Sequence, residues 1–224
     1  MSGLIAKMHT MARWLVGAMS LALATHAFAL GDDMVARLVS FGGACQRCDL
    51  AGRRLMGAKF IGADFSNASL IGCDLRGAAF TGSNFTGANL ARADVRGASM
   101  EGARFMVANF SDAAMAGVEG HGVNFINADL SHADLASAEL QGALLARVKA
   151  QDANFAGADL TGAILTDGVF VNADFKGAVL EGASLQGADL SRAQDLTQHQ
   201  ISGACTDAHT RLPAGLTGRN CGEH

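Results

Sequence analysis

A large apolar residue recurs at every fifth position over most of this 224-residue chain, and this period restricts the possible folds more than any other feature. The run extends from Cys48 to Arg192, and only Gly120 and Ala150 interrupt the series of large residues. A small residue, usually alanine, precedes each large one by two positions. The series begins with Leu50, Leu55, Phe60, Phe65, Leu70, Leu75, Phe80 and Phe85.

A period of five fits neither an amphipathic helix nor a regular strand. Five steps of about 100° in a helix would distribute the apolar residues around the whole cylinder. In a strand, the alternation of side chains would be broken once in each repeat. The period instead fits three extended residues followed by a tight corner, with the small and the large residue facing inward. Glycine two positions after most large residues agrees with a corner, as do Asn67, Asn127 and Asn172, because both residue types tolerate unusual φ values.

The repeated pattern Ala-Asp/Asn-Leu/Phe-X-Gly resembles that of the pentapeptide-repeat proteins, as in Ala63-Asp64-Phe65 and Ala128-Asp129-Leu130. The resemblance implies an all-β fold, a right-handed quadrilateral β-helix with one pentapeptide on each side. The coils of this β-helix would stack ~4.8 Å apart to form a rod. Short α-helical caps are expected at both ends of the rod. On this prediction, the large residues of successive coils lie directly above one another, as in Leu70, Leu90 and Phe110.

Residues 1–29 have the features of an export signal. A basic start at Lys7 and Arg13 precedes a short apolar stretch, and Ala27-Phe28-Ala29 fits a cleavage site. The apolar stretch is shorter than the roughly 20 residues that a membrane-spanning helix needs. We therefore expect cleavage after Ala29, a periplasmic or secreted protein, and no membrane span in the mature chain.

Segments on both sides of the repeat are expected to close the open ends of the β-helix, which would otherwise pair edge to edge. Residues 30–47 form the expected N-terminal cap, with a short helical pattern from Asp32 to Phe41. The β-helix is assigned to residues 48–193 and a C-terminal cap with a short helix to residues 194–224. This tail resembles the closing segment of exported pentapeptide-repeat proteins, and on that basis Cys205 and Cys221 are interpreted as a disulfide.

The Cys45-Gln46-Arg47-Cys48 motif is open to three interpretations. A redox-active pair typically lies at a helix N-terminus, whereas this one leads into a β coil. A zinc site would need two further ligands at a suitable spacing, and none follows. A structural disulfide fits an exported protein best. The fifth cysteine, Cys73, occupies an inward small position and is predicted to be a buried, inert thiol.

Charge and composition argue against a nucleic-acid partner. The formal net charge is −4, and removal of residues 1–29 takes away Lys7 and Arg13 but no acid, which leaves −6. A basic groove is therefore not expected. Trp14 is the only tryptophan, and the chain has no tyrosine, so the mature protein lacks these rings for stacking on bases.

The outward positions suggest one interaction surface. If the helix has four sides, one side carries five exposed apolar residues on successive coils, and such a patch often contacts a partner. The next side carries Val169 and Val171, and another holds Arg76 and Arg96 beside acidic residues, which indicates paired surface charges. The expected interaction face consists of Met106, Val107, Ile126, Leu144 and Ile164.

No motif of an enzyme, a metal site or a cofactor site is present, and the small residues should fill the interior without leaving a deep pocket. The favoured function is a non-enzymatic exported scaffold that binds an unidentified protein partner, a second copy included. The family resemblance offers a second hypothesis, a DNA mimic that binds gyrase and confers quinolone resistance. An enzyme is the least supported alternative.

Overall fold

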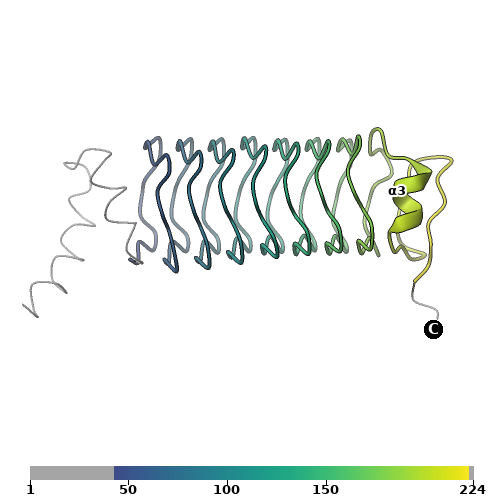
Figure 1. The fold of residues 1–224 in the computed structure, drawn as a ribbon, viewed down its shortest axis with the longest axis horizontal. Coiled ribbons are helices and arrows are strands. Elements are labelled where there is room, and N and C mark those ends of the chain that lie inside the picture. Colours follow the sequence, from purple (N-terminus) through teal and green to yellow (C-terminus); the bar gives the residue numbers. More distant parts are fainter. Residues whose placement is uncertain (1–42, 222–224) are drawn as a thin grey trace, which may run out of the picture.

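The computed structural model describes residues 43–221, which form a rod of stacked coils with a short helix at its C-terminal end (Figure 1). The expected export signal and the helical pattern from Asp32 to Phe41 lie outside the described residues.

The register of the coils repeats every four pentapeptides. Parallel β-bridges join residues 20 positions apart, from Ala44 with Asp64 at one end to Asp174 with Gln194 at the other. Each side of a coil contributes one bridged residue, so the rungs are isolated bridges rather than extended strands. The bridges place Leu70, Leu90 and Phe110 in one column, because their preceding residues are bridged in succession, and this confirms the predicted stacking.

Backbone hydrogen bonds between coils use the same atoms in each pentapeptide. On one side, the Leu70 amide donates to the Asn89 carbonyl at 2.7 Å, and the Asn89 amide donates back to the Ala68 carbonyl at 2.9 Å. The corner amide of Gly72 also donates to the next coil, at 2.9 Å to Ala91. Neighbouring coils therefore satisfy most of each other's polar backbone groups, as a packed interior requires.

Each corner is a tight turn whose second central residue has a positive φ. The Cys73 amide donates to the Leu70 carbonyl at 3.1 Å, which closes the turn around Gly72 at φ 63°. Many corners contain glycine, but several contain Asn, Asp or Arg. Val107 is the one β-branched residue among those with positive φ in residues 43–221, and its φ of 59° is unfavourable for a branched side chain.

Replacing Val107 with asparagine is expected to stabilise the protein by about 1 kcal/mol, because Asn tolerates positive φ and Val does not. Two other corners of the same column, Asn127 on the next coil and Asn67 two coils before, already have this residue at φ 59° and 57°. Chemical denaturation of both proteins measures the difference. A lower free energy of unfolding for Val107→Asn would contradict the assigned strain.

Aspartate and asparagine are frequent before the large residue because their side chains bond to the backbone of the corner. The Asn109 Oδ1 accepts from the Ser111 amide at 2.9 Å, and the Asp129 Oδ1 accepts from the Ser131 amide at 3.0 Å. This local bond is an alternative to regular sheet pairing for the amide that follows the large residue.

The interior of the rod is filled by the large and small residues of the repeat, nearly all of which are buried. Phenylalanines of successive coils stack, with ring centroids 5.0 Å apart for Phe60 and Phe80, and 5.2 Å for Phe65 and Phe85. Neighbouring columns meet edge to face, as in Phe80 and Phe85 at 5.1 Å. Both arrangements are favourable for aromatic rings.

The interruptions of the series are compensated by neighbouring volume. At Gly120, an added Cβ would lie 2.9 Å from the Leu140 Cδ2 and 3.1 Å from the Val123 Cγ1, so these side chains already occupy the space. Val118, which replaces the usual alanine, is fully buried. The interior is therefore close-packed at the break, as expected for a folded core.

At the C-terminal end, helix α3 (Gln198–Gly203) lies against the last coil (Figure 1). Thr197 and Gln200 form a capping box at its N-terminus, and Ile201 is fully buried. The Gln200 Nε2 donates to the Phe175 and Ala178 carbonyls, both at 2.8 Å, at the end of the rod. Within residues 43–221, no helix is both long and apolar enough for a membrane span.

Candidate interaction surface

The five apolar residues predicted to form the interaction face all lie on one side of the rod, from one coil to the next. Leu144 and Ile164 are joined directly by a bridge, and Leu144 is also bridged to Asn124. Val107 is 59% exposed and Ile164 39% exposed, whereas Met106, Ile126 and Leu144 are half-buried. The face is thus a shallow apolar wall rather than a groove.

The two long edges of this wall differ. One edge is a column of glycines, where an added Cβ would meet no other heavy atom within 4 Å. Internal packing therefore does not require glycine there, and side chains stand at equivalent corners elsewhere with the same sign of φ. The bare edge leaves the wall open to a partner's close approach. The glycine edge consists of Gly102, Gly122, Gly142 and Gly162. The opposite edge consists of Val107, Asn127, Arg147 and Asp167.

Other exposed apolar residues lie outside the predicted face and were missed in the sequence. Met56 is 60% exposed, Ile61 53% and Val179 44%. Ile61 and Val179 occupy outward positions of a second side, near opposite ends of the rod. Their outward repeat positions were the available signal, but they are not stacked on successive coils as the predicted face is. Val169 and Val171 are both half-buried.

The predicted pairing of surface charges is confirmed. Arg76 contacts Asp74 at 2.7 Å and Asp94 at 3.6 Å, and Arg96 contacts Asp94 at 2.6 Å. Hydrogen bonds from the arginines hold the pKa values of Asp74 and Asp94 below the ordinary range of aspartate, against the opposing effect of partial burial. The arginines and aspartates pair with one another, so Arg76 and Arg96 do not form a site for an external anion.

Four cysteines lie in the predicted pairs. The sulfur atoms of Cys45 and Cys48 are 2.00 Å apart, and those of Cys205 and Cys221 are 2.18 Å apart, so both pairs are at bonding distance. The second pair lies where the tail meets the end of the rod, close to the bridge between Thr206 and Asn220.

Cys73 has the buried environment that the sequence predicts. Its thiol donates to the Leu50 carbonyl with an Sγ–O distance of 2.9 Å. Burial is the main cause that raises the pKa of the Cys73 thiol to about 11. The thiol is therefore protonated and unreactive at neutral pH.

Within residues 43–221, metal-binding side chains are not gathered at one place. In the part of the chain that the structure describes, no group of three or more His, Cys, Asp or Glu side chains could hold a metal ion. His121 lies 3.8 Å from the Glu139 carboxylate, which is a surface contact between two exposed side chains.

Comparison with solved structures finds HetL and QnrB1 among the matches. HetL, from the cyanobacterium Nostoc and involved in heterocyst differentiation regulation, is 25% identical over 79% of this chain and 86% of its own, with a TM-score of 0.36. Full-length QnrB1, a plasmid-mediated fluoroquinolone resistance protein, is 19% identical over 75% of this chain and 95% of its own, with a TM-score of 0.30. No curated protein sequence matches the chain.

The family model described as pentapeptide repeats matches the chain in eight copies. The matched residues are 45–87, 68–105, 83–118, 103–138, 128–167 and 169–205. These ranges cover most of the chain and coincide with the bridged coils. The chain therefore belongs to the pentapeptide repeat family.

Proposed function

We propose that this protein is an exported, non-enzymatic scaffold that binds a protein partner through the wall of Met106, Val107, Ile126, Leu144 and Ile164. Pentapeptide repeat proteins form right-handed β-helices and are generally structural or interaction proteins, which supports the coarse assignment. The observation that carries the finer assignment is the column of outward apolar side chains on successive coils, exposed at Val107 and Ile164 and half-buried at the other three, beside a bare glycine edge.

The flatness of the wall suits a protein surface better than a small ligand. Small-molecule sites are concave and bury most of the ligand, whereas this wall is a row of bridged rungs. The strained Val107 adds support, because an unfavourable backbone conformation persists more often where it serves function. The mature chain is proposed to begin at Leu30, with residues 30–47 and 194–224 closing the two ends of the rod.

Charge placed on the wall is expected to weaken partner binding at least tenfold. In the double variant Ile126→Asp/Leu144→Asp, two carboxylates would be desolvated at the contact, which costs at least a factor of ten in affinity. Cross-linking and pull-down from the compartment that contains the exported protein, followed by mass spectrometry, measures the loss of partner and any change in oligomeric state.

The chain offers a matched control on another side. Ile61 and Val179 occupy the same two outward repeat positions as Ile126 and Leu144, and both are exposed. The variant Ile61→Asp/Val179→Asp should therefore retain the partner. Equal recovery of partner with both double variants would mean that the wall is ordinary surface.

The gyrase-binding DNA mimic is the second candidate, supported by the acidic net charge of −4 and by family membership. Gyrase is cytoplasmic, so this function requires that residues 1–29 remain uncleaved. Fractionation and intact mass distinguish the two proposals. A cytoplasmic chain with its leader that inhibits supercoiling favours the mimic, and an exported chain that begins at Leu30 excludes it.

A further inference from the structure

The regular coils end with a change of register that opens a pocket. Along the rod, bridged residues are 20 positions apart, but near the end Ser184 is bridged to Cys205 and Asp189 to Arg211. The segment from Cys205 to Arg211 is therefore one residue longer than the segment from Ser184 to Asp189 on the coil before it. The extra residue makes the loop of residues 206–210 bulge from the wall of the rod.

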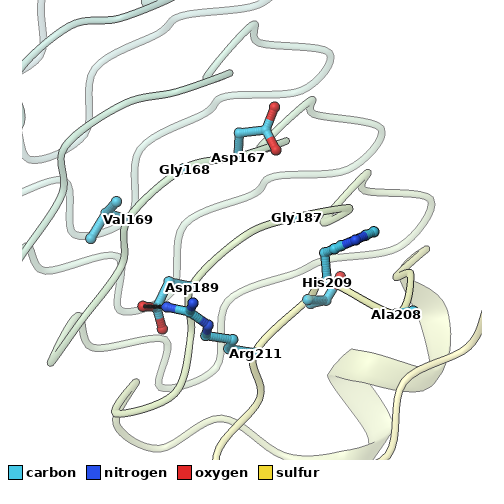
Figure 2. A pocket seen from close by; sticks show the side chains of 9 residues that line it. Asp167, Gly168, Val169, Gly187, Asp189, Ala208, His209 and Arg211 are labelled. Carbon is cyan, nitrogen blue, oxygen red and sulfur yellow. Dashed lines mark hydrogen bonds and ion pairs between the residues drawn. The ribbon is translucent and has the colours of Figure 1, made fainter.

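A pocket of about 600 Å³ lies beneath this loop (Figure 2). Three levels line it, with residues 167–169 on the first, Gly187 and Asp189 on the second, and residues 208–211 on the third. Gly187 lies between the other two levels, as Figure 2 shows. An added Cβ there would lie against the Asp167 carboxylate, so glycine at this corner leaves room for the Asp167 side chain.

Two of the carboxylates near the pocket, those of Asp189 and Asp207, already accept hydrogen bonds from other groups of the protein. Asp189 accepts from the Ser191 amide at 3.1 Å and hydroxyl at 2.6 Å, and from the Arg211 Nη1 at 3.1 Å. Asp207 accepts from the Gly187 amide at 2.9 Å, and this bond is the main cause of its lowered pKa. These two groups shape the pocket and hold the loop.

The remaining charged groups have unused hydrogen-bonding capacity. The Asp167 carboxylate accepts no hydrogen bond and joins no ion pair within residues 43–221, although its backbone amide is bonded. Arg211 uses only Nη1, and its side chain is 73% exposed. His209 contacts the Asp207 carboxylate through Nδ1 at 3.4 Å and keeps its other ring nitrogen available. An acceptor thus lines one end of the pocket, and the unused guanidinium N–H groups of Arg211 line the other.

We propose that this pocket binds a small zwitterion of dipeptide size. Asp167 would accept from the ligand's ammonium group, and Arg211 would donate to its carboxylate, with a charge-assisted hydrogen bond at each end. The level of Asp167 and that of the loop are two coils apart, or roughly 9–10 Å. This separation suits the ends of a dipeptide better than the adjacent charges of a free amino acid. Asp167 also stands at one edge of the wall, but none of the five apolar residues of the wall lines the pocket, so the proposal stands independently of the scaffold function.

Titration with alanyl-alanine, followed by the amide NMR signals of Gly168, Gly187 and Arg211, tests the site. Saturable shifts at millimolar peptide are expected. Asp167→Asn should weaken alanyl-alanine binding about tenfold, because it removes the charge that holds the ammonium group. The same variant should leave the weak binding of N-acetyl-alanyl-alanine unchanged, because that peptide has no ammonium group.

Asp112→Asn is the matched control, since Asp112 is another exposed corner residue with φ 59° outside the pocket. It should bind alanyl-alanine as the wild type does. Arg211→Gln should weaken alanyl-alanine binding but not that of alanyl-alanine amide, and unchanged circular dichroism would establish that the variants fold. Absence of shifts in the wild type, or equal binding of charged and blocked peptides, would overturn the proposal.

Discussion

Phe105→Ala is expected to lower the free energy of unfolding by about 3–5 kcal/mol, the usual cost of removing a buried aromatic ring from a close-packed core. Phe105 is fully buried and lies between the rings of neighbouring coils. Its centroid is 5.3 Å from that of Phe85 and 5.5 Å from that of Phe125 in stacked contacts, and 5.1 Å from that of Phe110 edge to face. The cavity would therefore interrupt two columns in the middle of the rod. Denaturant unfolding followed by circular dichroism measures the loss.

Met106→Ala is the adjacent control, because Met106 points outward and its truncation should change stability by no more than about 0.5 kcal/mol. Each coil contacts mainly its neighbours, so a weakened centre can also separate the unfolding of the two halves. A broadened or two-step transition for Phe105→Ala would agree with this account. A loss below about 1 kcal/mol would mean that the interior is not close-packed at this level.

Much of the rod follows from the five-residue period. The inward columns, the corners and the compensation at Gly120 could all be predicted, because each depends on residues a fixed distance apart in the sequence. The number of sides required the family resemblance, since a period of five does not determine how many pentapeptides close one coil. The bridges, 20 residues apart from Ala44 onward, supply that number.

The C-terminal end could be predicted only in outline. A short helix is expected within residues 194–224, and α3 spans Gln198–Gly203. The single extra residue between Cys205 and Arg211 leaves no periodic signal, so the pocket beneath the loop was not foreseen. The position of the predicted wall follows from the register of the coils. Whether a partner binds there depends on the partner's surface, which the repeat pattern does not specify.

Breaking the link between Cys205 and Cys221 is expected to destabilise the oxidised protein by about 3 kcal/mol, because the link closes a loop across a sequence separation of 16. The double variant Cys205→Ser/Cys221→Ser is compared with wild type by chemical denaturation without reductant. The tail also covers Thr206, whose hydroxyl donates to the Arg219 carbonyl at 2.9 Å, so a freed tail would lose this hydrogen bond. The effect should therefore appear as earlier loss of the end of the rod.

The pair Cys45 and Cys48 provides an internal comparison, because a sequence separation of only 3 restricts the unfolded chain less. Loop entropy predicts a loss of only about 2 kcal/mol for Cys45→Ser/Cys48→Ser. With reductant present, wild type and both variants should converge, since the constraint is then absent from all three. If the variants instead match the wild type under oxidising conditions, or if intact mass detects four free thiols besides Cys73, the two links do not form. The proposal of an exported, oxidised scaffold would then lose its covalent support.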